Sequence, residues 1–312
     1  MKVLITGING FVGTHLTRHL ARNQCEIVGI DLNAELNAEL AALKESVGIR
    51  IYSSDLSDTQ PLEEIFTAVG FDAVVHLAGE AFVPSGWKDP GRMLKSNTLC
   101  TINLLQAARN IDWKGTFLFV SSSDVYGSPA AAEMPLTEDS PTAPLSPYAS
   151  SKLAAEQFAG YFNSESIRVI IARPFNHIGP GQRASFVVPS FLLRIREAMR
   201  NNQKTIPVGE LRAGRDFTDV RDVVRAYGIL LKNGKAGEKY VICSGRAVTI
   251  QEILDLSLKI TGADLECIVD EKLRRTPDVR FGSAEKIKQL GWKPERTLEE
   301  SITDAWEQLQ SN

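Results

Sequence analysis

Tyr148 and Lys152 are four residues apart in a stretch whose apolar spacing predicts a helix over 148–161, so both side chains lie on one helix face. A tyrosine hydroxyl, with an ordinary pKa of about 10, needs a nearby cation to exchange a proton near neutrality. Lys152 can supply that cation. The pair therefore predicts acid–base chemistry, and the alternative is a surface tyrosine and lysine on an amphipathic helix.

Three consecutive serines, Ser121, Ser122 and Ser123, follow the apolar run 117–120, which predicts a buried strand. Ligands of open α/β sheets bind at the carboxyl ends of the strands. A proline-rich loop over 134–147 then leads into the Tyr148 helix. We therefore expect the serines and Tyr148 to lie at one ligand-binding edge of a sheet.

Gly7, Gly10 and Gly13 follow an apolar run at 3–5, at the start of the segment 11–20, in which apolar residues recur at helical spacing. Glycines at a first strand–helix junction let the backbone, including Phe11 and Val12, approach a pyrophosphate, and the helix N-terminus offers free N–H groups. The alternative is an ordinary tight turn. The position at the first junction favours a dinucleotide-binding loop.

Asp31 ends the second predicted strand, where a carboxylate can accept hydrogen bonds from both adenosine-ribose hydroxyls and would repel a 2′-phosphate. Leu32 follows, and no arginine is placed to receive such a phosphate. The sequence thus predicts NAD as the preferred cofactor, with NADP as the second possibility. The alternative is that Asp31 is only a capping or turn residue.

Strands alternate with helices through the first half of the chain, which predicts an α/β fold with a doubly wound parallel sheet. The expected strands are 3–5, 26–30, 50–52, 73–78, 117–120, 168–172 and 239–242, with helices at 93–108, 148–161 and 219–231. We expect a dinucleotide-binding Rossmann domain from 1–172 plus 215–245. A smaller α/β substrate-binding domain is expected from 173–214 plus 246–312.

The composition narrows the class of protein. The chain has 312 residues and a formal net charge of -3, which gives no electrostatic reason to expect a nucleic acid partner. Its four cysteines form no CxxC pair, so neither a metal site nor a disulfide framework is predicted. No signal peptide is evident, and no apolar stretch reaches roughly 18 residues, so we expect a cytoplasmic protein without a membrane partner.

With these motifs the chain resembles the extended short-chain dehydrogenase/reductases, which include nucleotide-sugar epimerases, dehydratases and 4-ketoreductases. The segments 173–182 and 214–222 look most like the GDP-4-keto-6-deoxymannose reductases. The matching segments are Thr6-Gly-Ile-Asn-Gly-Phe-Val-Gly13, His76-Leu-Ala-Gly79, Ser121-Ser-Ser-Asp-Val-Tyr-Gly127, Ser146-Pro-Tyr-Ala-Ser-Ser-Lys152, Arg173-Pro-Phe-Asn176 and Leu290-Gly-Trp-Lys-Pro294.

The resemblance implies roles for individual residues. Ser122 would be the catalytic hydroxyl, Tyr148 the acid/base, and Lys152 the residue that holds the nicotinamide ribose. Ser123 and Asp124 would face the sugar. Residues that would line the cofactor are Asp55, Leu56, Leu77, Ala78, Gly79, Asn97 and Ser121. Residues that would grip the nucleotide diphosphate are Asn176, Arg215 and Arg275.

The implied activity is NAD(P)H-dependent reduction of the C4 ketone of a nucleotide-linked 4-keto-6-deoxy sugar. A 4-epimerase or 4,6-dehydratase with tightly bound NAD is the first alternative, and a non-catalytic dinucleotide sensor is the second. Related dehydratases carry a base, commonly glutamate, where this chain has Asp124, and the shorter side chain predicts poor elimination.

The resemblance also implies a homodimer, in which the helices 93–108 and 148–161 of each subunit form a shared bundle. Two histidines suggest a general base, but His76 lies within a predicted buried strand and His177 in a substrate-side loop. For His76 we expect a hydrogen-bonded structural role.

Overall fold

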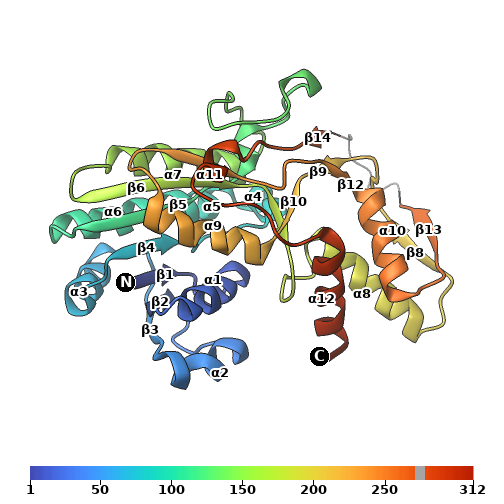
Figure 1. Cartoon of the computed structure of the whole chain (residues 1–312), viewed down its shortest axis with the longest axis horizontal. Helices are drawn as coiled ribbons and strands as arrows, with labels where there is room; N and C mark the ends of the chain where they lie inside the picture. The colour runs from blue at the N-terminus through green and yellow to red at the C-terminus, as the bar shows by residue number, and fades with distance from the viewer. Residues whose placement is uncertain (271–277, 312) are drawn as a thin grey trace.

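A seven-stranded parallel sheet forms the centre of the protein, whose computed structural model describes residues 1–270 and 278–311 (Figure 1). Its order confirms the predicted doubly wound α/β fold, because β1 lies between β2 and β4 and the chain winds outward from β1 in both directions. Across the sheet, the strands are β11 (Lys239–Ile242), β6 (Ile167–Pro174), β5 (Gly115–Val120), β4 (Ala73–His76), β1 (Lys2–Thr6), β2 (Glu26–Asp31) and β3 (Arg50–Ser53).

Helices cover both faces of this sheet because its strands are apolar on both sides. Val3 and Ile5 of β1 pack with one layer of helices, and Leu4 between them packs with the other. The first layer contains α1 (Phe11–Arg22), α2 (Ala38–Val47), α9 (Val220–Asn233) and α11 (Glu285–Lys288). The second contains α3 (Thr59–Val69), α6 (Cys100–Asn110) and α7 (Pro147–Tyr161).

The single helix predicted over 93–108 is interrupted. The chain forms α4 (Val83–Lys88) and α5 (Pro90–Leu94), then a π-helical turn, η1 (Lys95–Leu99), before α6 begins. Asn97 lies in this turn, and its side chain is buried and hydrogen-bonded to the neighbouring helix α7. Apolar spacing alone does not reveal an inserted residue, which explains the difference.

A second hydrophobic cluster lies beside the sheet, on the right in Figure 1. It is formed around α8 (Val187–Arg200), α10 (Ile250–Thr261) and α12 (Leu298–Ser311). The remaining strands form small sheets, β10 (Phe217–Asp219) with β7 (Asn176–Ile178), β13 (Glu266–Val269) with β8 (Thr205–Val208), and β12 (Val248–Thr249) with β9 (Gly214–Arg215) and β14 (Val279–Arg280). The predicted domain boundary at 214/215 falls within β9.

Two short 3-10 helices, η2 (Ser123–Tyr126) and η3 (Ala131–Glu133), connect β5 with the loop before α7.

Among the residues described, none of the helices is long and apolar enough to cross a membrane.

Candidate active site

The glycine turn after β1 is packed closely against the neighbouring backbone. Gly7 has a φ of 70°, and a Cβ there would lie 3.0 Å from the backbone of Ala78 at the end of β4. A Cβ on Gly13 would lie 2.3 Å from the carbonyl oxygen of Gly7. Gly10 caps α1 without a side-chain hydrogen bond, and the first turn, with Phe11 and Val12, carries no acidic residue. This turn fits a dinucleotide pyrophosphate.

Asp31 holds the glycine turn against the end of β2. One carboxylate oxygen accepts from the Asn9 N–H at 3.0 Å, and the other accepts from the Leu32 N–H at 2.9 Å. The turn role weighed from the sequence is therefore real. The predicted role toward the adenosine ribose stays a prediction, with which these bonds are compatible because each carboxylate oxygen can accept a second hydrogen bond.

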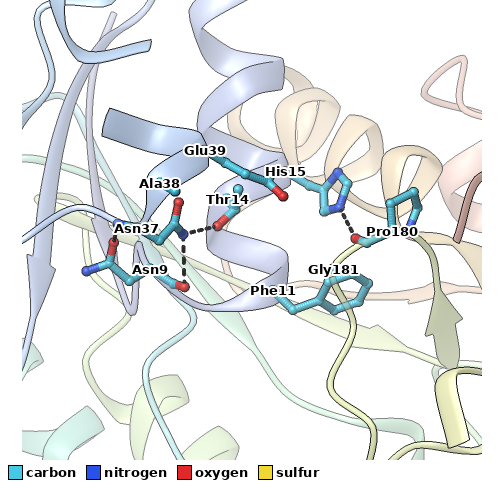
Figure 2. A pocket seen from close by; sticks show the side chains of 9 residues that line it. All are labelled: Asn9, Phe11, Thr14, His15, Asn37, Ala38, Glu39, Pro180 and Gly181. Atoms are coloured by element: carbon cyan, nitrogen blue, oxygen red, sulfur yellow. Dashed lines mark hydrogen bonds between the residues drawn. The ribbon is translucent and has the colours of Figure 1, made fainter. Parts of the chain in front are cut away.

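A pocket of about 290 Å³ adjoins the outer side of the glycine turn (Figure 2). His15 bonds to the carbonyl oxygen of Pro180 at 2.9 Å, and Phe11 stacks on His177 with ring centroids 6.1 Å apart. His177 thus packs against the start of α1, next to the glycine turn, and its pKa is lowered by burial. Of the residues that line this pocket, the sequence indicated only Phe11; the lining is formed by Asn9, Phe11, Thr14, His15, Asn37, Ala38, Glu39, Pro180 and Gly181.

Ser122, Tyr148 and Lys152 meet at the carboxyl end of β5. The Ser122 side chain lies close enough to the Tyr148 hydroxyl to lower its pKa, and Ser122 Oγ accepts from the Asp124 N–H at 3.1 Å. The Lys152 ammonium donates to the Val120 carbonyl at 2.9 Å and lies 5.2 Å from the Phe119 ring centroid. Helix α7 places Tyr148 and Lys152 on one buried face, as their spacing predicted.

The expected acidifying effect of Lys152 on Tyr148 is absent from this arrangement. Burial, followed by the charge of Asp124, raises the pKa of Tyr148 well above its ordinary value, while the Ser122 side chain opposes the rise. Burial also lowers the pKa of Lys152 to about 8. The difference arises because the lysine is turned toward Val120. Tyr148 is consequently a protonated donor at neutral pH.

Asn97 connects the turn after β4 to helix α7. Its amide nitrogen donates to Ser151 Oγ at 2.9 Å and to the Glu80 carbonyl at 3.0 Å, and its oxygen accepts from the Glu80 N–H at 2.9 Å. A Cβ on Gly79 would lie 2.4 Å from that oxygen. Ser151 Oγ donates in turn to the Tyr148 carbonyl at 2.8 Å. Ser151, missed in the sequence, therefore helps to position Tyr148.

Ser121 belongs to a buried ionic cluster behind the site. Its hydroxyl donates to Glu156 at 2.9 Å, and Arg173 forms a two-pronged ion pair with the same carboxylate at 3.1 and 2.5 Å. Arg173 also donates to the Tyr126 hydroxyl at 3.0 Å. Glu156 was not singled out from the sequence, although it lies one helical turn after Lys152.

The other predicted cofactor residues lie at the ends of β3 and β4. Asp55 accepts from the Ser57 N–H at 2.9 Å, and the Leu56 carbonyl accepts from Asn103 at 3.1 Å. The N–H groups of Leu77 and Ala78 donate to the backbone and side-chain oxygens of Thr6 at 3.3 and 3.2 Å.

His76 has the structural role expected from the sequence. Its two ring nitrogens are hydrogen-bonded to Thr6 and Thr101 at 2.7 and 2.9 Å, and burial lowers its pKa to about 3. Because both nitrogens are occupied and the neutral ring is favoured, His76 is not placed to act as a general base.

On the substrate side, Ser123 is buried and Asn176 is exposed. Arg215 donates to Asp278 Oδ1 at 2.5 Å and to the Gly214 and Asp278 carbonyls at 2.8 Å. Asp124 bonds to Arg280 at 3.1 Å, a partner that the sequence did not indicate. The predicted Arg275 lies outside the described residues.

Known proteins of similar sequence and fold support this arrangement. Residues 4–305 match the family model described as GDP-mannose 4,6 dehydratase. The chain is 39% identical to a GDP-6-deoxy-D-mannose reductase from Pseudomonas aeruginosa, over 96% of this chain and 94% of the relative. It is 32% identical to dTDP-glucose 4,6-dehydratase 1 of Escherichia coli, over 100% and 93%.

Solved structures give the same result. The structure of RMD from Pseudomonas aeruginosa complexed with NADPH is 37% identical, covers 99% of both chains and has a TM-score of 0.85. DesIV, a dTDP-glucose 4,6-dehydratase from Streptomyces venezuelae with NAD and TYD bound, is 28% identical, covers 100% of this chain and 98% of that one, and has a TM-score of 0.87. The chain therefore belongs to the GDP-mannose 4,6-dehydratase family, in agreement with its resemblance to the nucleotide-sugar dehydrogenase/reductases.

Proposed function

We propose that this protein is a reductase that converts the C4 ketone of a GDP-linked 4-keto-6-deoxy sugar to an alcohol, with NADH or NADPH as the reductant. The observation that carries the proposal is the buried, protonated Tyr148 hydroxyl paired with Ser122. A ketone that accepts hydride needs a proton donor at its oxygen, and this pair supplies one. The similarity to a GDP-6-deoxy-D-mannose reductase supports the same substrate class.

In this mechanism the sugar oxygen lies against Ser122 and Tyr148. The reduced nicotinamide cofactor, when bound, supplies the hydride to C4. Tyr148 donates its proton to the developing alkoxide, while the Ser122 hydroxyl donates a hydrogen bond to the same oxygen and stabilises its charge. Lys152, which already lies beside Tyr148 on α7, holds the nicotinamide ribose and fixes the distance between cofactor and sugar.

A 4,6-dehydratase or a 4-epimerase with tightly bound NAD is the alternative, since relatives of these classes also match. Elimination requires a base that removes the C5 proton. Asp124 is one methylene shorter than glutamate, and its carboxylate is bonded to Arg280. Reduction needs no such base, so the site favours the reductase.

For the cofactor we propose a preference for NADH. Asp31 places a negative charge where NADPH carries its 2′-phosphate. Its hydrogen bonds to Asn9 and Leu32 fix the carboxylate there. The similar structure from Pseudomonas aeruginosa was solved with NADPH, so this preference would be a difference between two relatives.

For the assembly we propose a cytoplasmic homodimer whose subunits meet through the helices around 93–108 and 148–161. Large apolar side chains exposed on these helices support it, because isolated subunits rarely leave several such groups together in water. They are Leu94, Leu99, Phe158 and Tyr161. We also propose the division into domains 1–172 plus 215–245 and 173–214 plus 246–312. Asn176 and Arg215 are proposed to bind the nucleotide diphosphate, and the same role predicted for Arg275 concerns a residue outside those that the structure describes.

The reaction is tested by incubating the purified protein with GDP-mannose, its 4-keto-6-deoxy derivative and UDP-glucose, each with and without NADH or NADPH. NMR then identifies the products. The proposal expects an alcohol at C4 from the keto sugar only when reduced cofactor is present. Conversion of GDP-mannose or UDP-glucose without added reductant would support the dehydratase or the epimerase instead.

A further inference from the structure

Asp124 is held from two sides at the entrance to the site. It lies in the first turn of the 3-10 helix η2, and its N–H donates to the side chain of the N-cap residue Ser122. Arg280 Nη1 donates to Asp124 Oδ1 at 3.1 Å and to the carbonyl of Gly127, the C-cap residue after the same helix, at 3.0 Å. One guanidinium group therefore joins both ends of the turn that presents Asp124.

Strand β14 fixes Arg280 in this position. Arg280 pairs with Arg215 in the β14–β9 ladder, and Asp278 lies between their guanidinium groups. Asp278 Oδ1 bonds to Arg215, and Oδ2 lies 3.2 Å from Arg280 Nε, which is an ion-pair distance without hydrogen-bond geometry. Charges thus alternate from Asp124 to Arg215, and Arg280 cannot turn away without leaving the Asp124 carboxylate without its ion-pair partner.

The ion pair between Arg280 and Asp124 is partly buried, since 18% of the Arg280 side chain and 28% of the Asp124 side chain are exposed. Partial burial strengthens an ion pair relative to one in open solvent. The bond also draws the carboxylate toward β14, and a displacement of about 1 Å from a reacting atom can cost on the order of 10²-fold in rate.

We propose that Arg280 is a specificity-determining residue, which holds the Asp124 carboxylate against β14 and thereby prevents it from taking a proton from the sugar. The inference rests on the proposed function, because it concerns a 4-keto sugar in the same site. It explains how a family with dehydratase members can carry a carboxylate here without elimination.

The chemistry that Arg280 suppresses can be observed directly. In a 4-keto sugar the C5 proton is acidic, because the C4 ketone stabilises the resulting enolate. A released Asp124 takes this proton, the electron pair of the C5–H bond enters the enolate, and the carboxylic acid exchanges its proton with solvent. When the acid returns a deuteron from D₂O to C5, the net change is deuterium for hydrogen, with no oxidant or reductant.

The test incubates GDP-4-keto-6-deoxymannose in D₂O with the wild-type protein and its variants, without reduced cofactor, and follows C5 deuterium by NMR. Arg280→Met should accelerate exchange on the order of tenfold or more, because the variant releases the Asp124 carboxylate, which then acts as a general base. Arg280→Lys, which keeps the cation, and the double variant Arg280→Met/Asp124→Asn should both exchange at the wild-type rate. Arg296→Met, which removes an arginine 3.8 Å from Asp304, is the matched control.

Exchange in Arg280→Met no faster than in wild type overturns the inference, provided that circular dichroism shows a folded variant. Arg280→Gln, which keeps a donor for the Gly127 carbonyl, serves the same purpose if the methionine variant does not fold. Reduction of the same sugar by the wild-type protein is measured in parallel. If the wild-type protein does not reduce the sugar, the proposed function is overturned. The role of Arg280 is decided by the exchange rates alone.

Discussion

The Tyr148 hydroxyl lies beside the Ser122 side chain in a buried position where Asp124 adds a negative charge. All three features concern the proton of Tyr148. Burial and the carboxylate keep it on the oxygen, and the Ser122 side chain opposes them in part. Tyr148 is therefore protonated at neutral pH, and it can give its proton only to a stronger base, such as the alkoxide that hydride addition to a ketone forms.

Replacing Tyr148 with phenylalanine should lower turnover by about 10²–10⁴-fold, because the variant keeps the ring and loses the proton donor. Affinity for the cofactor, measured by fluorescence titration, should stay close to that of the wild type. Tyr240→Phe is the matched control. Tyr240 lies on the edge strand β11, and its hydroxyl accepts a hydrogen bond from the Lys235 N–H. Turnover of Tyr148→Phe within a few-fold of wild type would remove the tyrosine from the mechanism.

Lys152 should make the folding stability depend on pH in an alkaline window. Burial lowers its folded pKa from 10.5 to about 8, so the unfolded chain binds more protons between these values and stability rises with pH across that range. Relative to Lys152→Met, the wild-type protein should gain on the order of 2 kcal/mol from pH 8 to pH 10.5. Denaturant unfolding at several pH values measures this. Parallel curves for the two proteins would contradict it.

Glu156→Gln should strongly destabilise the fold. Arg173 and Glu156 are 3% and 2% exposed, and neutralising one leaves the other as an uncompensated buried charge. The expected loss is about 3–5 kcal/mol in the free energy of unfolding. Glu299→Gln, at an exposed pair with Lys259, should cost less than about 1 kcal/mol. Equal losses in the two variants would show that burial of the first pair has no energetic consequence.

Steady-state kinetics should give a higher kcat/KM with NADH than with NADPH, because the Asp31 carboxylate repels a 2′-phosphate. Asp31→Ser should reduce this difference, since serine keeps an acceptor for the Asn9 N–H and removes the charge. A wild-type preference for NADPH would contradict the role given to Asp31.

Much of this site was predictable because its signals are local. The spacing of Tyr148 and Lys152 determines a shared helix face, and Gly7 and Gly13 lie within one turn whose close contacts require glycine. The apolar runs likewise predicted the parallel sheet. Such patterns need no knowledge of which distant segments meet.

The remaining features depend on long-range packing. Arg280 and Asp124 are 156 positions apart and meet only because β14 pairs with β9. The π-helical turn around Asn97 depends on hydrogen bonds to a different helix. The orientation of Lys152 toward the Val120 carbonyl is a rotamer that helical spacing does not determine.

The most direct test of the proposed reaction follows a deuteride from reduced cofactor deuterated at C4 of the nicotinamide. Incubation with GDP-4-keto-6-deoxymannose should give a product with one deuterium at C4 of the sugar, in equal amount to the cofactor oxidised, and GDP-mannose should remain unchanged. A sugar product without deuterium, together with formation of the 4-keto-6-deoxy sugar from GDP-mannose that Asp124→Asn abolishes, would contradict the account and identify a dehydratase.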